Sequence, residues 1–232
     1  MKTPSNLAEA FADVCGMDAT LGSKLAAYSA HLRALNSPVA LAYDHLVARL
    51  GASGAGLKAP GIGDVLPDFL LPDSANRLRC LDDYLQSGPL VVSFNRGHWC
   101  TFCKIELHEL AQARVAVEAC GGRLISIMPE SQQFVARLKP ILKGEVEILS
   151  DMFNSYAFSL GLVIWIGDEI RELMRGSAID AALSQGNPSW MVPVPATFVI
   201  GRDARIVARL VDPDFRRRMD VEDIIAALGR AA

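Results

Sequence analysis

Two cysteines, Cys100 and Cys103, lie where a strand-like segment gives way to a helical one, and this junction constrains the fold more than any other feature. Residues 90–95 are rich in β-branched and aromatic side chains, which predicts a strand, and the apolar spacing over 103–119 predicts a helix. Free amides and the macrodipole at a helix N-terminus stabilise a thiolate, lowering thiol pKa values from about 8.5 to about 3.5–7.5. Residues three apart on a helix share a face, so the two sulfurs can form a disulfide. The motif therefore predicts a redox-active pair.

Two alternative interpretations of this motif are a metal site and a pair of inert buried thiols. Zinc needs about four ligands, and the nearby imidazoles are those of His98 and His108. On a helix at about 100° per residue, His108 lies about 140° round from Cys103, so these ligands would not converge. The strand–helix junction favours redox chemistry over inert thiols. The other cysteines are more typical of small buried apolar residues, although Cys80 could be a remote resolving thiol: Cys15, Cys80 and Cys120.

The charges nearly balance, with 23 Lys and Arg against 26 Asp and Glu, so the chain offers no positive field for a nucleic acid. Residues 1–11 contain no apolar run that could form a signal-peptide core, and apolar stretches such as 162–166 are far too short to span a bilayer. Five cysteines with one closely spaced pair also differ from a secreted disulfide framework. We expect a cytoplasmic protein with neither a nucleic-acid nor a membrane partner.

The first 50 residues or so predict helices. One apolar stripe continues from Leu21 to Leu35, and Ser37 and Pro38 are the expected N-cap and first residue of a second helix that extends to Leu50. The small residues 51–56 suggest a boundary near 51–63, which gives an N-terminal helical extension over 1–60 and a main domain over 61–232. The apolar faces of these helices must be buried in their own domain or against another subunit, and we favour a homodimer.

The main domain alternates between strand and helix signals. Pro195 opens a β run, which makes Val194–Pro195 a candidate cis peptide facing the cysteines, although Pro193 and Pro195 could simply rigidify a loop. Strands followed by helices and then by a hairpin predict a layered α/β sheet with antiparallel final strands. The expected strands cover 124–128, 145–149, 196–200 and 205–210, and the expected helices cover 132–142, 153–160 and 220–228, the last closed by Gly229.

Five ordered segments resemble the AhpC/TSA (alkyl hydroperoxide reductase/thiol-specific antioxidant) group of peroxiredoxin-like proteins. The central segment, Arg96-Gly97-His98-Trp99-Cys100-Thr101-Phe102-Cys103 and then Glu106-Leu107, resembles the group's R-G-x-W-C-P-Y-C-x-x-E-L signature. The other four segments, spread over about residues 60 to 230, are 63–69, 88–94, 193–200 and 211–215.

The resemblance implies a thioredoxin-like fold, with a central mixed sheet flanked by helices. It also implies a peroxidase in which a thiolate attacks a hydroperoxide, a second thiol resolves the sulfenic acid to a disulfide, and a thioredoxin-type donor reduces that disulfide. The resemblance implies no metal, haem or flavin. A protein disulfide reductase and a redox-sensing interaction protein are the alternatives.

The chain departs from typical peroxiredoxins at two places, and from its close relatives at a third, between the two cysteines. Their P-x-x-x-T-x-x-C loop would place Arg96 at the Pro, Cys100 at the Thr and Cys103 at the peroxidatic cysteine. Their later active-site Arg is absent from the expected place, near Pro195. Arg96 could supply the missing cation or be a surface Arg without a role. Thr101-Phe102 replaces Pro-Tyr.

The roles of the two cysteines stay open at the level of sequence. A peroxiredoxin alignment makes Cys103 peroxidatic, whereas a thioredoxin alignment makes Cys100 the exposed nucleophile near the mouth of the site. Trp99 would shield the pair or be a plain core residue. Glu106, one turn after Cys103, would relay a proton or form an ordinary helix salt bridge, and Thr197 is a weaker supporting residue.

Overall fold

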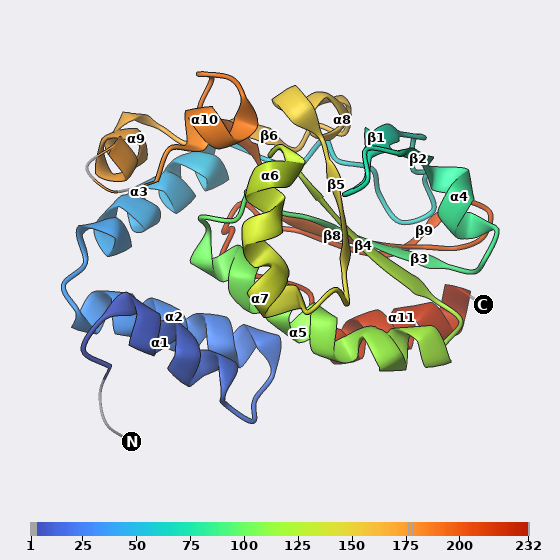
Figure 1. Cartoon of the computed structure of the whole chain (residues 1–232), viewed down its shortest axis with the longest axis horizontal. Coiled ribbons are helices and arrows are strands. Elements are labelled where there is room, and N and C mark those ends of the chain that lie inside the picture. The colour runs from blue at the N-terminus through green and yellow to red at the C-terminus, as the bar shows by residue number, and fades with distance from the viewer. Residues whose placement is uncertain (1–3, 176, 178, 232) are drawn as a thin grey trace.

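A five-stranded mixed sheet forms the centre of the protein in this computed structural model, which describes residues 4–175, 177 and 179–231. The strand order is β5-β4-β3-β8-β9 (Figure 1). Strands β3, β4 and β5 are parallel to one another, β8 is antiparallel to β3, and β9 is antiparallel to β8. The expected layered sheet and its closing hairpin are confirmed. The bounds are β3 Leu90–Phe94, β4 Arg123–Met128, β5 Glu147–Ser150, β8 Ala196–Ile200 and β9 Ile206–Val211.

Both faces of the sheet are covered, which explains why the central strand is apolar at every position except Ser93. All five residues of β3 are buried, and successive side chains point to opposite faces. Val91 packs under α5 (Thr101–Ala119) and α11 (Val221–Ala231), whereas Val92 packs towards α4 (Leu81–Leu85) and α8 (Ser155–Ser159). Helix α11 continues through Gly229, so this glycine does not close it as expected.

Short elements complete the main domain, and five of them stand in place of two longer helices expected from the sequence. Pro140 lacks an amide hydrogen and crowds the preceding turn, so the expected helix over 132–142 is divided into α6, a 3₁₀ turn and α7. Phe153 and Asn154 have positive φ angles of 65° and 57°, so helix α8 starts only at Ser155. The remaining bounds are β1 Leu70–Pro72, β2 Leu78–Cys80, α6 Gln132–Val135, η1 Ala136–Leu138, α7 Lys139–Leu142, η2 Met152–Asn154, β6 Val163–Trp165, α9 Asp168–Arg175, α10 Ala181–Gln185 and β7 Met191–Pro193.

The N-terminal extension consists of α1 (Leu7–Cys15), α2 (Leu21–Ala34) and α3 (Pro38–Ser53). Helices α1 and α2 pack on α5, and α3 packs on α9 at one end of the sheet (Figure 1). Ser37 occupies the N-cap of α3 as expected, but its side chain makes no capping hydrogen bond.

The apolar stripe of α2 is buried within the chain against the N-terminal part of α5. It therefore does not require a second subunit, and the homodimer stays a prediction, as does the division at residue 60. Among the residues that the structure describes, no helix is both long and apolar enough to cross a membrane.

Candidate active site

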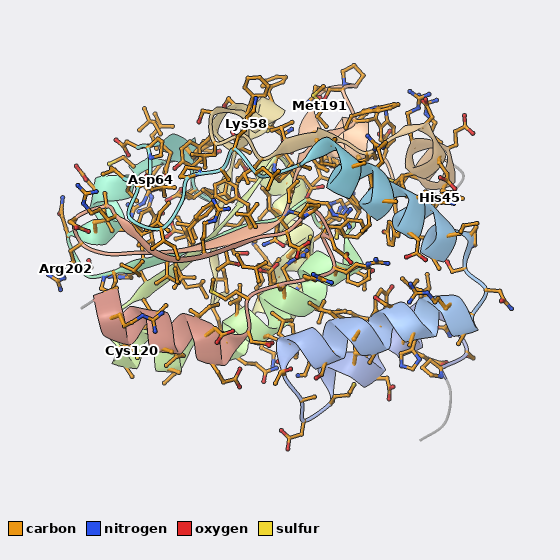
Figure 2. The ribbon with its side chains drawn as sticks, turned by 180° about the vertical axis from the view of Figure 1, so that it is seen from behind. His45, Lys58, Asp64, Cys120, Met191 and Arg202 are labelled. Atoms are coloured by element: carbon orange, nitrogen blue, oxygen red, sulfur yellow. The ribbon has the colours of Figure 1, made fainter. Side chains whose placement is uncertain are left out.

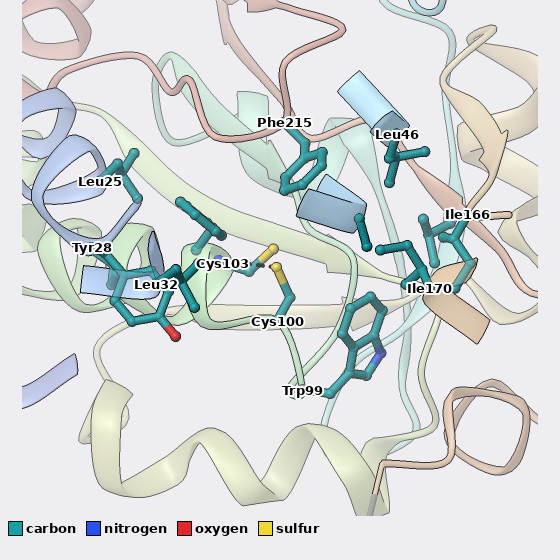
Figure 3. Packing of buried hydrophobic residues seen from close by; sticks show 14 of the residues in the cluster. Leu25, Tyr28, Leu32, Leu46, Trp99, Cys100, Cys103, Ile166, Ile170 and Phe215 are labelled. Atoms are coloured by element: carbon teal, nitrogen blue, oxygen red, sulfur yellow. Dashed lines mark hydrogen bonds between the residues drawn. The ribbon is translucent and has the colours of Figure 1, made fainter. Parts of the chain in front are cut away.

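The two cysteines meet at the N-terminus of α5, where β3 ends. Cys100 is the N-cap of the helix, and its sulfur accepts a hydrogen bond from the backbone N–H of Cys103 at 3.4 Å. Figure 3 shows the two sulfur atoms facing one another, with Trp99, Phe215 and Tyr28 around them. Both residues have no exposed surface, because the N-terminal helices cover this end of α5. The expectation that Cys100 is exposed is therefore wrong.

Arg96 places its buried positive charge next to the sulfur of Cys100. Its Nη2 atom lies 3.0 Å from the Cys100 sulfur, and the guanidinium carbon lies 3.8 Å from the centre of the Phe215 ring. No carboxylate pairs with Arg96 among the described residues, and its Nε atom is buried without a partner. A buried guanidinium is stable only with an anionic partner, so the contact favours the thiolate form of Cys100. The sequence left open that Arg96 lies at the surface, and its burial excludes that position.

These surroundings separate the two thiols electrostatically. Burial alone would raise the pKa of Cys100, but the thiol of Cys103 and the charges of Arg96 and Arg218 lower that pKa well below its usual range. The pKa of Cys103 is raised well above its usual range by burial and by the hydrogen bond and charge of Cys100. At neutral pH the arrangement therefore favours a Cys100 thiolate that accepts a hydrogen bond from a neutral Cys103 thiol.

Arg218 is a second buried cation at the site, and the sequence analysis missed it. Its Nη2 atom lies 3.8 Å from the Cys103 sulfur, and its Nε atom donates to Glu106 at 2.7 Å. The sequence shows no later active-site Arg near Pro195, and Arg218 instead enters the site from the loop before α11. The triplet 216–218 contains three arginines, and no local pattern distinguishes the buried one.

Glu106 anchors Arg218 through a buried polar network. Besides the ion pair, its carboxylate accepts hydrogen bonds from the hydroxyls of Ser93 at 3.0 Å and Thr197 at 3.5 Å. Burial raises the pKa of Glu106, and the charge of Arg218 opposes this rise. The pair joins α5 to the loop before α11, so the expected ordinary helix salt bridge is instead a buried contact between distant segments.

We expect Glu106→Gln to lower the free energy of unfolding by about 3–5 kcal/mol, because it leaves the Arg218 charge buried without a carboxylate. Chemical denaturation of the reduced protein measures this loss. Glu118→Gln is the matched control on the same helix: its partner Arg114 is solvent-exposed, so the loss should stay within about 1 kcal/mol. Equal losses in the two variants would contradict the importance of the buried pair.

The remaining expected site residues lie around this centre. Trp99 is buried beside Arg96, with 5.4 Å between the guanidinium carbon and the centre of its ring, and Phe102 packs edge-to-face on Tyr28. Thr101 is the first residue of α5. Pro195 is buried and precedes Ala196, which pairs with Phe94 at the end of β3. The structure describes no cis peptide bond, so the expected cis Val194–Pro195 bond is wrong.

The other three cysteines are free and half-buried. Burial raises the pKa of Cys15 to about 11, which favours the unreactive thiol. Cys120 caps the opposite end of α5, about 28 Å along the helix from the pair. Figure 2 shows Cys120 far from α3, the helix that carries His45. Cys80 ends β2 at the start of α4. Among the described residues, no group of three His, Cys, Asp or Glu side chains could hold a metal ion.

Comparisons with known proteins agree with this geometry. The model of the AhpC/TSA family matches residues 62–209, a segment that excludes α1–α3 and Arg218. Peroxidoxin BcpB from Mycobacterium tuberculosis is 19% identical, with 74% of this chain and 97% of that chain covered at a TM-score of 0.56. Peroxiredoxin 6 of Arenicola marina is 15% identical, with 73% of this chain and 72% of that chain covered at a TM-score of 0.57. Thiol peroxidase from Chromobacterium violaceum is 18% identical, with 74% of this chain and 88% of that chain covered at a TM-score of 0.54.

At these identities the likeness to solved structures shows the fold, which is thioredoxin-like with a mixed sheet flanked by helices. No curated protein sequence matches the chain.

Proposed function

This chain belongs to the AhpC/TSA family, and we propose that it reduces hydrogen peroxide or organic hydroperoxides through Cys100 and Cys103, with a thioredoxin-type protein as the electron donor. The contact of Arg96 with the Cys100 sulfur carries this proposal, because it supplies the thiolate that peroxide chemistry needs. Arg96 and Arg218 also place positive charge where negative charge develops on the departing oxygen.

The reaction divides into three balanced steps. The Cys100 thiolate attacks the terminal oxygen of the hydroperoxide, and an S–O bond forms as the O–O bond breaks. The leaving group, hydroxide from hydrogen peroxide or alkoxide from an organic hydroperoxide, takes up a proton and departs as water or an alcohol. The Cys103 sulfur then attacks the Cys100 sulfenic acid, an S–S bond forms and water leaves. A dithiol donor supplies two electrons and two protons, which returns both cysteines to thiols and leaves the donor as a disulfide.

Burial of the pair favours a peroxide over a protein disulfide as the oxidising substrate. Neither sulfur has exposed surface, so a protein disulfide cannot approach the closed dithiol form, whereas a small peroxide needs little space. The lowered pKa of Cys100 within a C-x-x-C motif is also typical of disulfide reductases, so this activity is the second candidate.

Oxidation offers a physical route by which a protein donor reaches this buried site. Disulfide formation removes the negative charge on Cys100 and leaves Arg96 buried without its anionic partner. An unpaired buried charge costs several kcal/mol, which weakens the packing of the N-terminal helices over the site.

We therefore expect amide hydrogens in α2 and α3 to exchange about tenfold faster or more in the disulfide form than in the dithiol form. Mass spectrometry of peptides after exchange measures this, with α11 as an internal reference whose exchange should not change. Equal protection of α2 and α3 in the two forms would contradict a charge-driven opening.

The proposed function is tested by two assays on the same protein. In the first, a thioredoxin system supplies electrons and hydroperoxide consumption is followed through NADPH. In the second, reduction of insulin disulfides is followed. We expect peroxide turnover that exceeds insulin reduction. Insulin reduction without peroxide turnover would replace the peroxidase with a disulfide reductase, and the absence of both activities would favour a redox-sensing protein.

A further inference from the structure

The N-terminal extension contributes one aromatic ring directly to the site. Tyr43, on α3, packs edge-to-face on Phe215 and Phe102, with ring centres 5.0 Å and 6.0 Å apart. The guanidinium carbon of Arg96 lies 5.7 Å from the centre of the same ring. Tyr43 thus contacts the cation that holds the Cys100 thiolate, although it lies outside the segment that the family model matches.

Tyr43 differs from the other aromatic residues around the pair in its exposure to solvent. Tyr28, Trp99, Phe102 and Phe215 are more than nine-tenths buried, whereas Tyr43 is partly exposed. Burial raises the pKa of Tyr43, the charge of Arg96 opposes this rise, and the charge of Cys100 adds to it. Tyr43 is therefore partly exposed and also lies within electrostatic reach of the Cys100 sulfur.

Asp44, the residue after Tyr43, forms ion pairs that hold this part of α3 in place. Asp44 binds Arg216 in the loop before α11 and also accepts two hydrogen bonds from Arg33 on α2, at 3.1 Å and 3.2 Å. Farther along α3, Arg49 donates to the backbone carbonyl of Trp165 at 2.7 Å. The helix is thus tied to three separate segments, so the ring of Tyr43 is held against Arg96.

We propose that Tyr43 is a specificity-determining residue, whose ring closes the route to Cys100 and admits hydrogen peroxide and small alkyl hydroperoxides while excluding hydroperoxides with a bulky aromatic group. The substrate class rests on the proposed peroxidase function, but the closure of the route does not. We expect removal of the ring in Tyr43→Ala to open this route to Arg96, and removal of the hydroxyl alone in Tyr43→Phe to leave the route closed.

Alkylation of Cys100 by reagents of two sizes tests the closure without using peroxidase activity. Iodoacetamide is the small reagent and pyrenylmaleimide the bulky one, and mass spectrometry of the Cys100 peptide gives each rate. We expect the ratio of the bulky to the small rate to rise about tenfold or more in Tyr43→Ala. Tyr43→Phe, which retains the ring, should retain the wild-type ratio. Leu41→Ala is the matched control on α3, because Leu41 is 60% exposed.

The same variants test the substrate class. The ratio of kcat/KM for cumene hydroperoxide to that for hydrogen peroxide should rise about tenfold or more in Tyr43→Ala and stay unchanged in Leu41→Ala. If the wild type consumes no hydroperoxide, the proposed function fails, and the alkylation ratio still decides the role of Tyr43.

An unchanged alkylation ratio in a folded Tyr43→Ala protein would overturn the proposal, as would a rise in Trp99→Ala alone. Folding of each variant is checked by circular dichroism and thermal unfolding. If Tyr43→Ala does not fold, Tyr43→Leu retains an apolar contact, removes the ring and is subject to the same criterion.

Discussion

Replacing Cys100 with serine is expected to lower hydroperoxide turnover by about a thousandfold or more, to the background rate of the donor system. A serine hydroxyl beside Arg96 is not ionised at neutral pH, so no nucleophile of comparable strength is left at the helix N-terminus. Steady-state peroxide consumption with a saturating dithiol donor measures this loss.

Cys103→Ser is the matched comparison, because it removes the other sulfur from the same helical turn. This variant should still react with one equivalent of hydroperoxide, at Cys100, and then stop because no neighbouring thiol can form the disulfide. Retention of full turnover by Cys100→Ser would assign the attack to another thiol and contradict the role inferred from the pKa separation.

The second large effect is expected from Arg96→Met, which retains an unbranched apolar side chain but removes the charge. An opposite charge in contact lowers a pKa by about 1–3 units, so its loss should raise the pKa of Cys100 and lower the thiolate fraction near pH 6.5 by about tenfold or more. The rate of Cys100 alkylation by iodoacetamide, followed from about pH 6 to about pH 8, measures the thiolate fraction.

The pH dependence of the alkylation rate shows in which direction Arg96 shifts the pKa of Cys100. In the wild type the pKa of Cys100 lies well below its usual range, so the alkylation rate should change little over the upper part of this window. In Arg96→Met the rate should rise with pH throughout it. Arg202→Met, in the exposed β8–β9 turn, is the control and should keep the wild-type profile. A wild-type profile in Arg96→Met would contradict the assignment of Arg96 as the partner of the thiolate.

The parts of the site that were predictable from sequence are those whose determinants are local. The apolar run of β3, the C-x-x-C motif and the helical spacing of α5 lie within 30 residues, so they predicted a strand–helix junction with a redox pair. Arg96 was named because it begins the segment that resembles the family signature. The sequence did not show that Arg96 is buried, because its burial depends on aromatic rings from α3 and the loop before α11.

The parts that were missed depend on contacts between segments far apart in the chain. Arg218 reaches Cys103 across 115 residues, and nothing local separates it from Arg216 and Arg217. The covering of the pair by the N-terminal helices was missed for the same reason. An amphipathic stripe indicates that a surface must be buried but does not identify the surface that buries it. The trans Val194–Pro195 bond shows the same limit, since a Pro at a strand start is compatible with either isomer.

Trapping of the sulfenic acid distinguishes the cysteine that attacks the hydroperoxide, proposed to be Cys100, from the one that resolves the product, proposed to be Cys103. Cys103→Ser and Cys100→Ser are each treated with one equivalent of hydrogen peroxide in the presence of dimedone, and the labelled peptide is identified by mass spectrometry. We expect a dimedone adduct on Cys100 in Cys103→Ser and no adduct in Cys100→Ser. An adduct on Cys103 in Cys100→Ser, with none on Cys100 in the other variant, would contradict this assignment.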